Sequence, residues 1–119
     1  MKITLLFLIC FVTFANVNAA RKDFMREGHY KGYIGCFVDD GHRLLRRFAG
    51  QYNMSVGKCR HLCRGYKYLG LQYAYQCFCG NHLNHRVYPQ SSELQCNMGC
   101  TSEPHRMCGG VWRNSVYKV

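Results

Sequence analysis

The sequence predicts a small α+β domain that is cross-linked by several disulfides. Three observations lead to this prediction. An N-terminal targeting segment contains one of the nine cysteines, and its removal leaves an even number. An even number of cysteines in a short exported chain is typical of a disulfide framework. Two of the remaining cysteines then have the spacing of a helix, and two others have the spacing of a strand.

These two spacings predict a helix that is joined to a strand. Cys59 and Cys63 are four residues apart, and such residues share one helix face, with Cβ atoms about 6 Å apart. Cys77 and Cys79 are two residues apart in a run rich in Tyr, Leu and Phe, and alternate residues share one strand face at about 6.6–6.8 Å. Because the separations match, a helix face laid on a strand face closes two disulfides side by side.

Residues 1–19 predict a signal peptide and therefore a secreted, extracellular protein. Lys2 gives a positively charged start, residues 3–14 form an apolar run, and residues 17–19 offer a small-residue cleavage site. The apolar run is shorter than the roughly 20 residues that a transmembrane helix needs. Cleavage removes Cys10. Zinc is the alternative use of such cysteine spacings, but an oxidising compartment argues against it, so we expect no metal and no cofactor.

The exported chain is strongly basic. The full sequence has 16 Lys and Arg residues against 6 Asp and Glu residues, a formal net charge of +10 at pH 7. Outside the cell, the polyanions that meet such a surface are sulfated or sialylated glycans and anionic membranes, with nucleic acid a distant third. Solubility alone is the alternative explanation. We divide the mature chain into a basic N-terminal arm, residues 20–32, and one domain, residues 33–118.

The first half of the domain is predicted to hold one strand before the helix. Residues 33–38 predict this strand, and residues 39–41 (Asp-Asp-Gly) predict a turn whose carboxylates bond to their own backbone. An amphipathic stretch at residues 43–48 and a connection at residues 50–53 lead into the helix. The connection ends in a sequon, so Asn53 is a candidate site of N-glycosylation in a eukaryotic protein.

The second half is predicted to hold the helix and two further strands. Ser55 is the expected N-cap, and Gly65 suits the left-handed position that follows a helix. Residues 66–79 predict one long strand, in which Gly70 indicates a bend or a close backbone approach. The remaining segments are a polar loop at residues 80–95, a cysteine pair with four-residue spacing at residues 96–100, and a terminal strand at residues 111–119.

With all eight cysteines placed, the pattern resembles the WSC domain from about residue 33 to residue 118. This family occurs in fungal cell-wall stress sensors, in Kremen-type receptors and in fungal carbohydrate-active enzymes. The match rests on the cysteines and on the glycine and aromatic residues around them. The motifs are Gly35-Cys36-Phe37-x-Asp39, Arg43-x-Leu45, Cys59-x-x-x-Cys63, Gly65-Tyr66-x-Tyr68, Gly70-Leu71-Gln72-Tyr73, Cys77-Phe78-Cys79-Gly80-Asn81, Cys96-x-x-x-Cys100, Cys108-Gly109-Gly110-x-Trp112 and Ser115-Val116-Tyr117.

The resemblance implies a small antiparallel sheet crossed by one helix, similar to PAN/apple domains, and it implies carbohydrate binding. The disulfides of the family pattern are Cys36–Cys96, Cys59–Cys77, Cys63–Cys79 and Cys100–Cys108. Two positions depart from the pattern. Many members begin the helix with Thr-x-Glu, and this chain lacks the glutamate. Many also have a small-Gly-Asn/Asp turn after the seventh cysteine, where this chain has Thr101, Ser102 and Glu103, in a loop that could touch ligand, so the family's specificity does not carry over to it.

We expect no catalytic site. Asp39 and Asp40 are adjacent, so their side chains diverge, unlike the paired carboxylates of a glycosidase. Glu93 and Glu103 lie in loops without an identifiable partner. All the mature cysteines are assigned to disulfides, which leaves no thiol nucleophile.

Two sets of residues are candidates for ligand contact. Sugars present apolar C–H faces, which stack on aromatic rings, and hydroxyls, which need polar partners. Tyr73 and Tyr75 alternate along the predicted strand on the face of its two cysteines, so we expect them in the core. The first candidate set therefore comes from the polar loop: Asn81, Asn84, Arg86 and Tyr88.

The second candidate set is basic. Arg43, Arg46 and Arg47 belong to a wider basic cluster in this part of the chain. Within it, Arg60 and Arg64 are four residues apart and lie one step round the helix from its cysteines, so we expect them to face solvent. With Lys67 they form a stripe suited to sulfated or carboxylated chains, because Arg donates bidentate hydrogen bonds. An ordinary solvated helix face is the alternative.

The leading hypothesis is a secreted, non-catalytic carbohydrate-binding module that recognises acidic or sulfated glycans of the cell surface, matrix or cell wall. The alternative is a secreted effector, such as a venom component, that binds an extracellular receptor or channel protein. A third hypothesis, an antimicrobial protein that acts on anionic membranes, is disfavoured because no amphipathic helix is free to insert. We expect neither a nucleic-acid partner nor stable membrane insertion.

Overall fold

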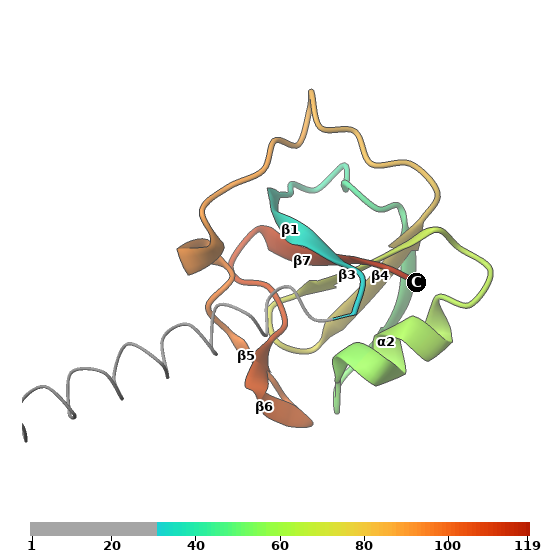
Figure 1. The fold of residues 1–119 in the computed structure, drawn as a ribbon, viewed down its shortest axis with the longest axis vertical. Coiled ribbons are helices and arrows are strands. Elements are labelled where there is room, and N and C mark those ends of the chain that lie inside the picture. Colours follow the sequence, from blue (N-terminus) through green and yellow to red (C-terminus); the bar gives the residue numbers. More distant parts are fainter. Residues whose placement is uncertain (1–30) are drawn as a thin grey trace, which may run out of the picture.

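The computed structural model describes residues 31–119, so the predicted signal peptide and most of the arm lie outside the described residues. Five antiparallel strands form one sheet in the order β1-β7-β3-β4-β2, and β5 pairs with β6 in a separate hairpin (Figure 1). This is the predicted α+β fold. Its elements are β1 (Tyr33–Val38), β2 (Arg47–Gln51), α2 (Val56–Leu62), β3 (Tyr68–Gln72), β4 (Gln76–Gly80), the 3-10 helix η1 (Glu93–Gln95), β5 (Gly99–Cys100), β6 (Glu103–Met107) and β7 (Arg113–Lys118).

Two disulfides join helix α2 and its C-cap residue Cys63 to strand β4, which lies between β3 and β2 in the sheet. The Cα atoms of Cys59 and Cys77 are 5.5 Å apart, and those of Cys63 and Cys79 are 5.3 Å apart. All four of these cysteines are fully buried. The other two disulfides are Cys36–Cys96 and Cys100–Cys108. The four pairs are the same as those that the family resemblance implies.

Successive residues of β4 pack on opposite faces of the sheet, as strand geometry requires. Cys77 and Cys79 face α2 in a core with Leu69 and Leu71. Phe78 points the other way, into a second core whose other members are Phe37, Leu44, Leu45, Tyr88 and Val116. Figure 1 shows α2 on one side of the sheet and the loop after β4 arching over the other side. This second core therefore supports the loops after β1 and after β4.

The predicted long strand at residues 66–79 is wrong, because a turn divides it into β3 and β4. Tyr73 and Ala74 have φ values of 58° and 69°. Glycine and asparagine usually occupy such left-handed turn positions, so the sequence lacks the usual turn signal. Tyr73 and Tyr75 consequently lie in this turn and do not share a strand face with the cysteines.

Strand β2 was also not predicted, since its residues were assigned to the amphipathic stretch and the connection. It pairs only with β4 and forms an edge of the sheet. Its side chains are exposed or half-buried and show no alternation of buried and exposed positions. Alternation is the usual sequence signal of a half-buried strand. The short β5–β6 hairpin was missed for a similar reason, because β6 is mostly polar and half-exposed.

The start of α2 explains both departures from the family pattern. Ser55 is the N-cap as predicted, and its Oγ accepts a hydrogen bond from Lys58 N at 3.0 Å. Thr101 Oγ1 accepts from Met54 N at 2.7 Å, and Glu103 Oε1 accepts from Val56 N at 3.4 Å. In a capping box, the glutamate of the helix start accepts a hydrogen bond from a backbone N–H there. This chain lacks that glutamate, and Glu103 accepts from a backbone N–H of the helix start. The side chains of Thr101 and Glu103 therefore bond to the backbone on either side of the N-cap residue Ser55.

The turn before β7 yields a test of the fold. Gly109 has φ of 76°, and a Cβ at this position would clash with the carbonyl oxygens of Leu71 and Arg113. We expect Gly109→Ala to lower the free energy of unfolding by about 2 kcal/mol or more. Gly57→Ala is the matched control, since a Cβ there meets nothing within 4 Å. Alanine in this helix should instead stabilise the domain by up to about 1 kcal/mol. Guanidinium unfolding with disulfides intact measures both changes, and a Gly109→Ala variant as stable as wild type would contradict the packing.

Candidate functional site

A groove of about 760 Å³ lies between the loop after β1 and the loop after β4. Leu44, Leu45 and Gly80 contribute apolar surface to it. Most of its other lining residues carry a polar or charged group. They are Asp40, His42, Arg43, Arg46, Arg47, Tyr66, Asn81, His82, Asn84 and Tyr88. The groove is thus polar, rich in arginine and backed by the second core.

The structure brings part of the first candidate set together. Asn81, Asn84 and Tyr88 line the groove, whereas Arg86 is exposed and does not line it. Asn81 also accepts a hydrogen bond through Oδ1 from Lys67 N at 3.0 Å. This bond connects the groove wall to the chain that follows the helix.

The basic stripe does not line the groove. Arg64 is exposed as expected, but Arg60 is half-buried. Arg60 donates to Lys31 O at 2.7 Å, and its guanidinium lies 5.8 Å from the centroid of the Tyr117 ring. The arginines that do line the groove are Arg43, Arg46 and Arg47. Their sequence signal is the run of basic residues around Leu44 and Leu45, which does not by itself place them beside the loop after β4.

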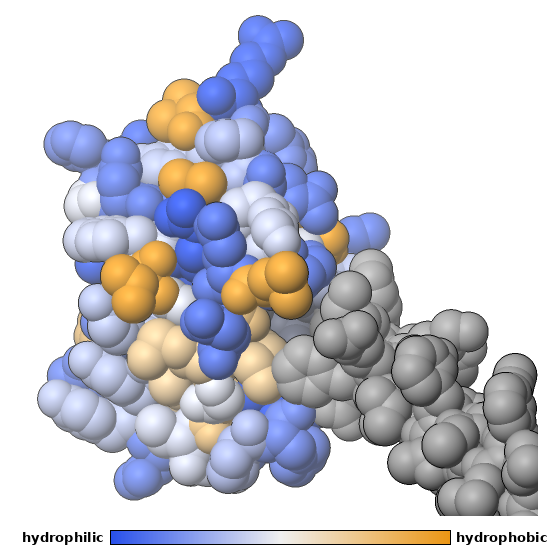
Figure 2. All heavy atoms as spheres, turned by 90° about the vertical axis from the view of Figure 1, so that its left-hand side faces the viewer, coloured by the Kyte–Doolittle hydropathy of each residue, from blue (hydrophilic) through white to orange (hydrophobic). Residues whose placement is uncertain are grey.

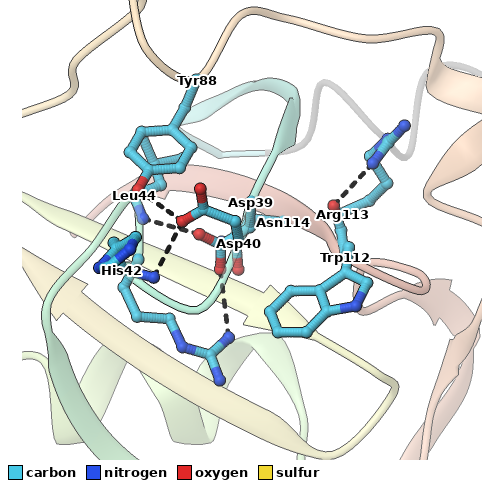
Figure 3. Close-up of polar contacts among 9 residues, drawn as sticks. Asp39, Asp40, His42, Leu44, Tyr88, Trp112, Arg113 and Asn114 are labelled. Atoms are coloured by element: carbon cyan, nitrogen blue, oxygen red, sulfur yellow. Dashed lines mark hydrogen bonds and ion pairs between the residues drawn. The ribbon is translucent and has the colours of Figure 1, made fainter.

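Tyr88 connects the two loops that form the groove. Its ring is buried, with 7% of the residue exposed. Its hydroxyl donates to Asp40 Oδ1 at 2.7 Å, and His42 N donates to the same oxygen at 2.9 Å (Figure 3). The hydrogen bond from Tyr88 is the main cause that lowers the pKa of Asp40, and it raises the pKa of Tyr88 to about 12. Tyr88 therefore shapes the wall, and its hydroxyl is already engaged.

Asp39 holds the loop after β1 in place. It is 4% exposed. Its Oδ1 accepts from Leu44 N at 2.7 Å, and its Oδ2 accepts from Asn114 Nδ2 at 3.0 Å (Figure 3). Gln72, with its amide nitrogen turned toward Asp39, donates to Oδ2 at 2.9 Å. A buried carboxylate with this many donors has a structural role, because each donor fixes part of the loop.

Arg43 completes this arrangement. Its NH1 lies 3.3 Å from Asp39 Oδ2. Its guanidinium lies 4.7 Å from the centroid of the Phe78 ring and 5.1 Å from that of the Trp112 ring, within the range of a cation–π contact. Arg43 is thus largely occupied by internal partners. Arg46 and Arg47 are exposed, so they supply the accessible positive charge of the groove.

The exposed guanidinium groups of Arg46 and Arg47 give this groove side chains that can bind a polar anion. Among its described lining residues, Asp40 is the one carboxylate. The sulfur atoms of Cys59, Cys63 and Cys77 lie within 4.8 Å of one another, but each belongs to a disulfide and is no thiolate ligand. On the face drawn in Figure 2, the strongly apolar residues form separate spots among hydrophilic ones. That face therefore shows no broad apolar surface.

Comparison with known families matches residues 33–110 to the WSC domain. The chain belongs to the WSC domain family. The WSC domain of this chain is similar to human Kremen protein 2, with 34% identity over 95 residues, which are 76% of the chain and 21% of that protein. It is 33% identical over 90 residues to a WSC domain-containing protein of Arthroderma benhamiae, covering 71% of the chain and 10% of that protein. It is also 36% identical over 96 residues to the Drosophila melanogaster xylosyltransferase oxt, covering 72% of the chain and 10% of that protein.

The WSC domain thus spans about a fifth or less of the length of these relatives. In residues 31–119, no helix has the length and apolar character needed to cross a membrane.

The contact between Tyr88 and Asp40 predicts a pH effect. The pKa of Asp40 lies below its usual value of 3.8. Because the folded state lowers this pKa, the ionised carboxylate stabilises the fold above about pH 4, and this contribution is lost as the pH falls through the lowered pKa. Tyr88→Phe removes the main cause, so we expect the pKa of Asp40 to rise toward 3.8. A carboxyl ¹³C NMR titration of both proteins measures the shift. An unchanged Asp40 titration would show that Tyr88 does not hold this carboxylate.

Proposed function

We propose that this WSC domain is a secreted, non-catalytic carbohydrate-binding module and that an acidic or sulfated glycan binds in the groove. The observation that carries the proposal is the position of Arg46 and Arg47, which are exposed and line the groove beside Asn81 and Asn84. The predicted signal peptide and the disulfides support an extracellular location. The family membership supports carbohydrate as the ligand class.

The side chains of the groove suit such a ligand in three ways. Guanidinium groups of Arg46 and Arg47 donate paired hydrogen bonds to sulfate or carboxylate. The exposed amides of Asn81 and Asn84 both donate to and accept from sugar hydroxyls. Tyr66, which is half-buried, adds an aromatic ring at the side of the groove. Together they offer charge, polarity and apolar surface to a sugar chain.

The described residues of the groove do not include the pair of carboxyl groups that glycoside hydrolysis requires. Hydrolysis uses two carboxyl groups on opposite sides of the scissile bond. Asp40, the carboxylate among the described lining residues, already accepts the Tyr88 hydroxyl. The match to a xylosyltransferase covers 10% of that protein, so it supports a shared module and not a shared activity.

Substitution of both groove arginines tests the proposal. We expect Arg46→Gln/Arg47→Gln to weaken binding to heparin, a sulfated polysaccharide, by about tenfold or more. Charge-assisted hydrogen bonds are worth about 1.5–3 kcal/mol, and each 1.4 kcal/mol is about tenfold in affinity. Affinity measured by calorimetry at several salt concentrations should fall with salt for wild type and less steeply for the variant.

Two exposed arginines outside the groove provide matched controls. Arg64→Gln/Arg86→Gln removes the same formal charge as the groove variant. Neither of these residues lines the groove, so the variant isolates the effect of position. We expect this variant to keep most of the affinity. Equal losses in both variants would indicate general charge attraction, and a loss confined to the control would move the site to the helix and the outer loop. Absence of binding to any polysaccharide at low salt would refute the proposed function.

A further inference from the structure

A pair of stacked tyrosines lies at the end of β2 that is remote from the groove. The rings of Tyr52 and Tyr75 are nearly parallel, with an angle of 9° and centroids 5.4 Å apart. Tyr52 is 61% exposed, although its ring rests on Tyr75. Arg47 and Tyr52 are five residues apart along this edge of the sheet, which corresponds to about 16 Å in a strand. The tyrosine pair is thus a separate feature from the groove.

The backbone that carries this pair is strained and held firmly. Tyr52 and Asn53 have φ values of 67° and 45°, in the left-handed region. This conformation is costly for a residue such as tyrosine, while asparagine tolerates it better. Hydrogen bonds restrain the backbone at and after these two residues: Tyr52 N donates to Tyr75 O at 2.9 Å, and Met54 N donates to Thr101 Oγ1 at 2.7 Å. Such strain persists only where the surroundings fix it, and it often marks a functional position.

Asn53 follows the exposed ring directly and begins the sequon. Its side chain is exposed and has no hydrogen-bond partner among residues 31–119. The other two sequon residues are engaged by the fold, since Met54 is fully buried and Ser55 caps the helix. A sugar on Asn53 therefore stays outside the core, next to the exposed Tyr52 in the chain.

We propose that Asn53 carries an N-linked glycan whose first N-acetylglucosamine packs on the open face of the Tyr52 ring. In the transfer, Asn53 Nδ2 forms a bond to C1 of the sugar and loses one proton. The bond that breaks joins C1 to the diphosphate of a lipid-linked oligosaccharide donor, and the lipid diphosphate leaves with the electron pair.

The chemistry of the first sugar fits the ring. The substituents of β-linked N-acetylglucosamine are equatorial, so its axial C–H bonds form an apolar face that stacks on an aromatic ring. Attachment to the neighbouring residue gives the sugar a high effective concentration, so a weak contact is sufficient. Tyr75 supports the opposite face of the Tyr52 ring. The glycan thereby covers the exposed tyrosine pair and stabilises the strained bend. This inference does not rest on the function proposed for the groove.

The experiment compares the protein with and without the sugar. The full chain is secreted from a eukaryotic host that makes high-mannose glycans, and an endoglycosidase trims the glycan to a single N-acetylglucosamine. Asn53→Asp is the unglycosylated reference, because aspartate also tolerates the left-handed region and leaves the Ser55 cap intact. We expect intact mass to show one sugar on Asn53 and the glycosylated protein to melt about 2–6 °C above Asn53→Asp.

Variants of the ring separate stacking from a general effect of the glycan. Tyr52→Ala should abolish the difference in melting temperature, and Tyr52→Phe should retain it. Phe48→Ala is the matched control, since Phe48 is an exposed aromatic residue (49%) of β2, the strand that leads to Tyr52, and its ring contacts Phe78 instead of Tyr75. We expect the difference to persist in this variant.

A spectroscopic measurement on the wild-type protein keeps the test valid if Tyr52→Ala does not fold. Protons of the sugar should be shifted upfield by the ring current and should show nuclear Overhauser effects to the Tyr52 ring. An unmodified Asn53, a melting difference that survives in Tyr52→Ala, or a sugar without contacts to Tyr52 would each overturn the proposal.

Discussion

The position of a short helix on the sheet depends on two neighbouring disulfides. Helix α2 has 7 residues, which is too short for an isolated helix to be stable in water. Cys59–Cys77 and Cys63–Cys79 close loops of 18 and 16 residues, and a loop of this size contributes about 3 kcal/mol in the chain-entropy account. The same strand, β4, carries Phe78 on its opposite face. The disulfides therefore order both sides of the sheet, including the core beneath the groove.

A buried carboxylate has a comparable role on the far side. Asp39 accepts hydrogen bonds from the backbone of its own loop and from β7, and it lies beside the guanidinium of Arg43. Removal of a carboxylate with these partners would leave several donors unsatisfied. Leu44 and Leu45, which follow Arg43, are buried in the second core, and Arg46 and Arg47 after them are exposed. The conformation of the loop after β1 thus determines which arginines of the groove are accessible.

The sequence predicts well what depends on short-range spacing. Cysteine separations of four and two residues correctly predict that a helix and a strand are joined by two neighbouring disulfides, although the strand itself was predicted too long. The family resemblance adds the remaining pairs. The hairpin turn at Tyr73 and Ala74 was not predictable, because neither residue type signals a left-handed turn and the conformation is imposed by tertiary hydrogen bonds, including Ala74 N to Cys108 O. Edge strand β2 lacks alternation and was missed for that reason.

The groove was only half predictable, since two distant loops build it. Asn81, Asn84 and Tyr88 were recognised as polar and aromatic loop residues, and they line it. Arg86 belongs to the same loop but does not line the groove. Its position was not predictable, because loop residues have no fixed period from which the direction of a side chain can be inferred. Arg46 and Arg47 join the site only through the packing of Leu44 and Leu45 on the second core. No local pattern contains that information.

A distant hairpin supplies hydrogen-bond acceptors to the start of α2, so these two segments cannot be exchanged independently. The bonds from Met54 N to Thr101 and from Val56 N to Glu103 join the helix start to the β5–β6 hairpin. The Cys100–Cys108 disulfide, which constrains that hairpin, therefore also acts on the helix at long range. A chimera that transplants the helix alone from a relative would separate partners that compensate for each other, so segments 54–58 and 101–103 have to be exchanged together.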